Sequence, residues 1–207
     1  MRTRVKICGF TRVEDAMAAA ELGVDAIGLV FYPPSPRNVS LMQAAEIVRA
    51  LPAFVTVVGL FVDAESAWVE RVLSEINVDC LQFHGDETAD ACRGYRKPYI
   101  KAIRIRQDTD WSGVERMYHD AAGLLLDAYH PDMHGGTGCG FDWNLIPEQR
   151  RLPLVLAGGL SSDNAVLAVQ QVRPYALDVS SGVELDKGVK DKAKMAAFIR
   201  KTNQAIL

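Results

Sequence analysis

Short apolar runs alternate with longer stretches of helical periodicity along most of the chain. Eight runs rich in Val, Ile, Leu and Phe predict β-strands, at residues 4–8, 25–31, 54–62, 78–83, 98–103, 122–127, 152–158 and 175–181. Several runs are apolar at successive positions, which is typical of parallel strands covered on both faces. Between most of them, apolar residues recur at helical spacing, as in 13–22, 41–51, 65–76 and 191–206. A weaker helical pattern, interrupted by Gly113, covers 111–118.

This alternation predicts right-handed strand–helix–strand units and a parallel sheet, hence an α/β fold. Eight such units can close into a (β/α)8 TIM barrel, and 207 residues is at the lower end of the usual size for that fold. A doubly wound open sheet is the alternative. No linker or shift in composition divides the chain, so we expect a single barrel domain over 1–207.

Polar side chains gather on one face near the C-terminal ends of the predicted strands. They are Lys6 and Cys8, Gln82 and His84, Asp127, and Asp178 and Ser180. The opposite faces of these strands are apolar, so a closed barrel brings the polar groups to one mouth, where barrel enzymes place their active sites. The first and eighth strands are neighbours in a barrel. We therefore expect an ion pair or a water-bridged contact between Lys6 and Asp178 beneath the site.

Two glycine-rich loops, LAGGLSSDNA and DVSSGVE, follow the seventh and eighth predicted strands. Loops at these positions form the usual phosphate site of such barrels, although either sequence alone also suits a plain turn. The residues expected to bind phosphate are Gly158, Gly159, Ser180, Ser181 and Gly182. In the first loop, Ser161, Ser162 or Asp163 is expected to cap a helix whose free N–H groups favour phosphate.

Two other loops carry candidate binding groups. Three prolines in FYPPSPRNVS stiffen the segment before Arg37, whose planar fork suits a carboxylate, although most loop arginines are simply solvated. The segment HPDMHGGTGCG holds four glycines in six residues and suits a mobile lid. His130 and His134 there have a spacing that binds metal only on a helix, which Pro131 argues against, so no metal site is expected.

Composition and charge narrow the class of partner. The net charge is −3 with no basic block, which favours a small metabolite and gives no reason to expect binding to nucleic acid or membrane. No apolar run approaches the ~20 residues that span a bilayer, and the start MRTRVK lacks a signal-peptide core, so we expect a cytosolic protein. The four cysteines lack CxxC spacing and are expected to be free thiols.

The motifs together are identified as those of a known family. RVKICGFT, the SPR of PPSPR, LQFHGDE, LLLDA, HGGTGCGFDW, LAGGL and DVSSGVE, in this order along the whole chain, resemble phosphoribosylanthranilate isomerase of tryptophan biosynthesis. The resemblance implies a (β/α)8 barrel without a cofactor and an Amadori rearrangement. It places Cys8 at the general base, Asp127 at the general acid and Arg37 at the anthranilate carboxylate. Cys139 with Gly140, and Phe83, depart from the usual family sequence.

That chemistry sets requirements on the two reacting groups. An acid must protonate the furanose ring oxygen and a base must remove the C2′ proton. The acid role needs a raised pKa for Asp127, which burial behind three leucines is expected to supply. The base role needs a lowered pKa for Cys8, which we expect from Lys6 on the same strand face. The alternative for Cys8 is that it simply packs as a small hydrophobic residue.

The remaining polar residues at the mouth are expected to contact the substrate. Gln82, His84 and Asp178 have this role, and for His84 a second interpretation is that it acts as a catalytic base.

Two other functions stay open. A cyclase resembling indole-glycerol-phosphate synthase would use Lys6 or Lys101, and a phosphosugar-binding protein would need no reactive thiol. The sequence leaves open whether the chain is a monomer or a homodimer, and whether it accepts a second aminoaldose phosphate.

Overall fold

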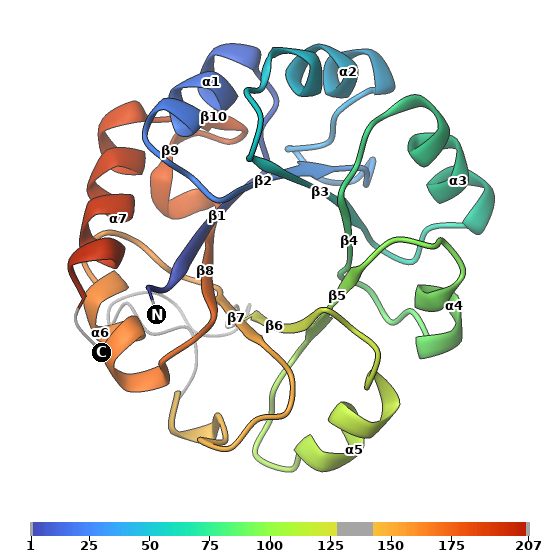
Figure 1. The fold of residues 1–207 in the computed structure, drawn as a ribbon, viewed down its shortest axis with the longest axis vertical. Helices are drawn as coiled ribbons and strands as arrows, with labels where there is room; N and C mark the ends of the chain where they lie inside the picture. Colours follow the sequence, from blue (N-terminus) through green and yellow to red (C-terminus); the bar gives the residue numbers. More distant parts are fainter. Residues whose placement is uncertain (1, 128–142, 206–207) are drawn as a thin grey trace.

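The computed structural model describes residues 2–127 and 143–205 and has eight parallel strands closed into a barrel (Figure 1). The strands are β1 (Arg4–Cys8), β2 (Ala26–Val30), β3 (Thr56–Phe61), β4 (Cys80–Phe83), β5 (Tyr99–Ile103), β6 (Gly123–Asp127), β7 (Leu154–Ala157) and β8 (Ala176–Val179). Each strand pairs with the next in sequence, and β1 pairs with β8 in the register that places Lys6 opposite Asp178. The barrel prediction is confirmed, and the open sheet is excluded.

Helices form a ring around the strands (Figure 1). They are α1 (Val13–Glu21), α2 (Leu41–Ala50), α3 (Ser66–Glu75), α4 (Ala89–Arg93), α5 (Trp111–Met117), α6 (Ala165–Val172) and α7 (Lys192–Gln204). The weakly predicted helix is present as α5. Between β6 and β7, the described residues contain only a 3-10 turn, η1 (Trp143–Leu145).

The start of α6 differs from the expectation. None of Ser161, Ser162 and Asp163 caps it, because the helix begins one residue later, after Asn164. The side-chain oxygen of Asn164 accepts a hydrogen bond from the backbone N–H of Ser161, and its amide donates to the Gly159 carbonyl. The loop after β7 is therefore braced by Asn164.

A small hairpin interrupts the barrel pattern after β8. A 3-10 turn, η2 (Ser181–Val183), leads into β9 (Glu184–Asp186), which pairs antiparallel with β10 (Val189–Lys190) before α7 begins. The hairpin was not predicted, because its strands are only three and two residues long and mostly polar. It places Glu184 and Lys190 beside the barrel mouth.

Strand parity divides the core into two layers. Outward-facing strand residues pack against the helices in a core that also contains residues of the helices and loops, and its largest members, Phe10, Phe31, Phe61 and Phe198, are fully buried. A smaller apolar cluster of Leu125, Val155, Ala157 and Ala176 fills part of the lumen. Phe83 is 2% exposed in the outer layer against Phe61, so its departure from the family sequence lies away from the barrel mouth.

Candidate active site

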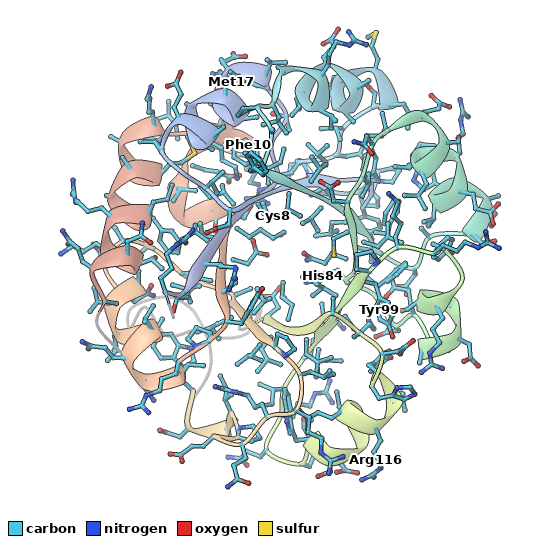
Figure 2. All side chains as sticks on the ribbon, in the orientation of Figure 1. Cys8, Phe10, Met17, His84, Tyr99 and Arg116 are labelled. Atoms are coloured by element: carbon cyan, nitrogen blue, oxygen red, sulfur yellow. The ribbon has the colours of Figure 1, made fainter. Side chains whose placement is uncertain are left out.

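A cavity of about 550 Å³ opens at the carboxyl ends of the strands. It is lined by ten of the eleven residues that the sequence analysis selected, namely Cys8, Arg37, Gln82, His84, Asp127, Gly158, Gly159, Asp178, Ser180 and Ser181. Figure 2 shows Cys8 and His84 on the inner side of the ring of strands, at β1 and just beyond β4. Side chains distant in sequence thus meet in one cavity, as strand parity predicted.

The floor of the site is a buried ion pair. Lys6 Nζ lies 3.0 and 2.9 Å from the two carboxylate oxygens of Asp178, and both side chains are almost fully buried. Burial opposes the charge on Lys6, yet the Asp178 carboxylate raises the pKa of the ammonium above its usual value. The predicted pair is confirmed.

Cys8 stands at the end of β1 with only 6% of its surface exposed. Gly28 lies opposite it on β2, and a Cβ atom at position 28 would come within 2.6 Å of the Cys8 sulfur, so the glycine makes room for the thiol. Burial raises the pKa of the Cys8 thiol, and the positive charge of Lys6 offsets this only in part. The expected lowering of the Cys8 pKa was therefore wrong, because burial dominates and Lys6 is paired with Asp178.

Asp127 ends β6 and belongs to a chain of three polar side chains. Its Oδ2 lies 3.0 Å from Nε2 of His84, and Nδ1 of His84 lies 2.9 Å from the amide nitrogen of Gln82. The Asp127 side chain is 28% exposed, so the burial expected from the preceding leucines is only partial. His84 contacts the candidate acid directly, which goes beyond the pocket-lining role expected for it.

Arg37 enters the cavity from the proline-rich loop, but it already holds a carboxylate of the protein. Its Nε and Nη2 donate to the two oxygens of Glu184, at 2.7 and 2.6 Å. Although burial opposes the charge of Glu184, hydrogen bonds from Arg37 and Lys190 lower the pKa of its carboxyl group. One edge of the guanidinium is thus occupied, while Nη1 has no hydrogen-bond partner among the described residues.

Lys190 of the hairpin ties this arrangement to the barrel. Its fully buried ammonium lies 2.8 Å from Glu184 and donates to the backbone carbonyl of Cys8 at 2.6 Å. Ser180 also donates to the Cys8 carbonyl, at 3.0 Å. Neither Glu184 nor Lys190 was selected from the sequence. The only available signal was the glutamate of DVSSGVE, which the resemblance quoted without a role.

The two glycine-rich loops lie against each other. A Cβ atom at Gly182 would collide with the Leu160 carbonyl oxygen, so only glycine permits this contact. Gly182 is therefore the one selected residue outside the cavity lining, with a packing role that brings the loops together. Gly158 and Gly159 both have positive φ angles, 79° and 62°, which other residues rarely adopt.

The lysines that a cyclase would need are committed elsewhere. Lys6 is paired with Asp178, and Lys101 Nζ lies 2.6 Å from the Gly85 carbonyl oxygen and 3.1 Å from Glu87.

Within residues 2–127 and 143–205, no three His, Cys, Asp or Glu side chains are grouped to hold a metal ion. In the same residues, no helix is long and apolar enough to cross a membrane. The lid candidates, with His130, His134 and Cys139, lie outside the described residues.

Comparison with known proteins decides the family. The family model described as N-(5'phosphoribosyl)anthranilate (PRA) isomerase matches residues 5–201. The chain belongs to this isomerase family. The isomerase of Nitrosococcus oceani is 58% identical over 200 residues, which cover 97% of each chain. The phosphoribosylanthranilate isomerase activity in tryptophan biosynthesis, implied by the sequence motifs, is thereby confirmed.

Solved structures of phosphoribosylanthranilate isomerases agree. The crystal structure of the Thermotoga maritima isomerase superposes with a TM-score of 0.88 at 41% identity, covering 97% of this chain and 98% of that one. Another crystal structure of a phosphoribosylanthranilate isomerase holds reduced 1-(o-carboxyphenylamino)-1-deoxyribulose 5-phosphate. It superposes with a TM-score of 0.85 at 40% identity, with the same coverage. A third, at TM-score 0.84 and 38% identity with the same coverage, concerns monomers generated from the dimeric Thermotoga maritima enzyme.

Proposed function

We propose that this isomerase works by acid–base catalysis, with Asp127 as the general acid and Cys8 as the general base. The observation that carries the proposal is that both side chains line the same cavity as Arg37 and the two glycine-rich loops. The substrate, N-(5-phosphoribosyl)anthranilate, has a carboxylate at one end and a phosphate at the other. A cavity with a guanidinium and a glycine-rich anion site suits both ends.

The proposed reaction begins with ring opening. Asp127 gives its proton to the furanose oxygen, the C1′–O bond breaks, and the nitrogen lone pair forms a C1′=N iminium. Cys8 then removes the C2′ proton, which leaves a C1′=C2′ enolamine. The ketose forms when the C2′ hydroxyl loses its proton and C1′ gains one. Protons and electrons balance without a cofactor.

The raised pKa of Cys8 has a consequence for this sequence of steps. A thiolate formed from such a thiol is scarce at neutral pH but is a stronger base than an ordinary thiolate. The positive iminium at C1′ stabilises a thiolate beside C2′ by direct attraction. We therefore place ionisation of the Cys8 thiol, with loss of its proton to solvent, after ring opening.

The binding roles follow from the two ends of the cavity. Nη1 and the remaining Nη2 hydrogen of Arg37 present a second edge to the anthranilate carboxylate, while Glu184 holds the first. Phosphate binds the backbone N–H groups around Gly159 and Ser181. Gln82 and Asp178 border the sugar between these ends. The single domain over 1–207 and the cytosolic location stay predictions.

We also propose that the chain forms a homodimer through the amino-terminal end of the barrel. Phe54 has 102% relative exposure there, beside a cavity of about 400 Å³ that it lines with Pro98 and Tyr175. An exposed ring and an open cavity on the same face are complementary features, and in a two-fold dimer the ring of each copy can enter the cavity of the other. The dimeric form of the Thermotoga maritima relative supports this choice of partner.

An isotope effect tests the proton-abstraction step. Substrate carrying deuterium at C2′ is compared with unlabelled substrate in the wild type and in Cys8→Ser. We expect a primary isotope effect on kcat that is larger in Cys8→Ser. The serine hydroxyl removes the C2′ proton less readily than the cysteine thiol does, so this step limits the rate more strongly in the variant. An isotope effect of one in both proteins, with normal turnover by Cys8→Ser, would remove Cys8 from the mechanism.

A further inference from the structure

The amide of Gln82 is a buried polar group with one unmatched atom. The side chain is fully buried in the lumen, and its nitrogen lies 2.9 Å from Nδ1 of His84. Its oxygen, Oε1, is also buried and has no hydrogen-bond partner among the described residues. An unsatisfied acceptor of this kind is costly and calls for a physical reason.

The two ends of a glutamine amide exchange places when it rotates by 180° about Cγ–Cδ. With the nitrogen toward His84, Nδ1 accepts, so a neutral ring carries its hydrogen on Nε2 and donates to ionised Asp127. With the oxygen toward His84, Nδ1 must carry a hydrogen to donate. The hydrogen bond at one ring nitrogen thus determines the state of the other.

We propose that Gln82 and His84 are positioning residues that switch between two arrangements as the Asp127–His84 pair gains or loses a proton. In the unloaded arrangement, the Gln82 nitrogen donates to Nδ1 and Nε2–H donates to the Asp127 carboxylate. In the loaded arrangement, Nδ1–H donates to Gln82 Oε1, and the added proton lies between Nε2 and Asp127. This inference rests on the proposed function, since it explains how the general acid starts its cycle protonated.

The proton balance closes over one turnover. Asp127 passes the added proton to the furanose oxygen, and Cys8 receives the C2′ proton. The C2′ proton restores the Cys8 thiol, which lost its own proton to solvent after ring opening, and the Asp127–His84 pair takes up one proton from solvent. A second cavity of about 310 Å³, lined by His84 and Asp127, gives solvent a route to the pair.

Other charged groups face the Asp127–His84 pair. They are Lys6 and Asp178 in the lumen, and Asp86, Lys101, Arg104 and Arg106 around the second cavity. Lys6 and Lys101 are paired with the buried carboxylates of Asp178 and Glu87. The pair itself is the group whose proton count changes.

Nitrogen-15 NMR of wild type labelled in the histidine rings and the glutamine side-chain amides tests the switch directly. The sequence has four histidines, so the His84→Gln variant identifies the His84 signals. We expect the hydrogen on Nε2 at alkaline pH, protonation of Nδ1 on acidification, and a shift of the Gln82 side-chain amide signals at the same midpoint. A hydrogen on Nδ1 at every pH, or Gln82 signals that do not respond, would overturn the inference.

Kinetics provide the second test. Gln82→Met keeps the volume but has neither donor nor acceptor, and we expect kcat to fall about 10- to 100-fold with KM changed less than about twofold. The alkaline limb of the kcat profile should move to lower pH. Gln82→Glu keeps the acceptor for Nδ1–H and should retain more of kcat than Gln82→Met. Leu125→Met, buried in the same lumen, is the matched control and should behave as wild type.

The outcomes separate this inference from the proposed function. If Asp127→Asn is fully active, the acid–base proposal fails. If Asp127→Asn is inactive while Gln82→Met keeps the wild-type kcat and pH profile, only the switch fails. Should Gln82→Met not fold, the NMR titration of the wild type decides alone.

Discussion

At the residue scale, the Cys8 thiol is governed by burial more than by its charged neighbours. Burial raises its pKa, so the thiolate fraction at pH 7 is below that of a free cysteine. We therefore expect iodoacetamide to modify Cys8 more slowly than free cysteine at pH 7, with the rate still rising at a pH where free cysteine is already ionised. Peptide mapping by mass spectrometry measures the rate of modification at Cys8. Modification of Cys8 faster than free cysteine at pH 7 would contradict this environment.

Arg37 gives a second prediction at this scale. Arg37→Ala should lower kcat/KM by about 10- to 100-fold, mainly by raising KM. This is the effect of losing a charge-assisted hydrogen bond to the substrate carboxylate. Arg37→Lys should not restore it, since an ammonium cannot bind Glu184 and the substrate carboxylate through two planar edges. Lys190 still neutralises Glu184 in both variants. Wild-type kinetics in Arg37→Lys would show that the carboxylate binds elsewhere.

Single residues also show what sequence can and cannot predict. Lys6 and Asp178 were paired correctly, because alternation along a strand and closure of the barrel fix which side chains meet. The pKa of Cys8 was not predictable, because it depends on a balance between burial and several charges in three dimensions. The partner of Arg37 was missed for a similar reason, since Glu184 lies 147 positions away.

At the element scale, a buried ion pair fixes the turn that follows β4. Lys101 on β5 pairs with Glu87, whose two oxygens also accept from the backbone N–H groups of Asp63 and Gly85. Lys101→Met should lower the free energy of unfolding by about 3–5 kcal/mol, because it leaves Glu87 buried without its cation. Urea denaturation of the variant and the wild type measures this difference in the free energy of unfolding.

The double variant is the control for that experiment. Glu87→Gln combined with Lys101→Met removes the uncompensated charge and should recover part of the loss. A Lys101→Met variant as stable as wild type would mean that Glu87 is neutral or solvated in the folded protein.

Elements with strong periodicity were predicted well, and short polar ones were not. The eight barrel strands and the helices at Leu41–Ala50 and Ser66–Glu75 were expected from apolar spacing, and the weaker pattern at Trp111–Met117 also forms a helix. The β9–β10 hairpin carries no such signal, because it is held by side chains such as Glu184 and Lys190 rather than by an apolar face. Two residues that organise the candidate site therefore come from the element that sequence reasoning missed.

At the scale of the whole molecule, the two ends of the barrel have different tasks. The carboxyl ends of the strands hold the catalytic cavity, and the amino-terminal end presents Phe54. Phe54→Ser should shift the sedimentation coefficient from dimer to monomer without changing the circular dichroism spectrum, because the exposed ring has little role in the core. Identical sedimentation of wild type and Phe54→Ser would refute this interface.

The most direct test of acid–base catalysis by Asp127 and Cys8 measures turnover in the two catalytic variants. Consumption of phosphoribosylanthranilate is followed by loss of its fluorescence with wild type, Cys8→Ser and Asp127→Asn, after circular dichroism confirms that all three fold alike. We predict rapid loss with wild type and a kcat lower by about 10²- to 10⁴-fold in each variant, the usual effect of losing an acid or base. Turnover at the wild-type rate by either variant would contradict it.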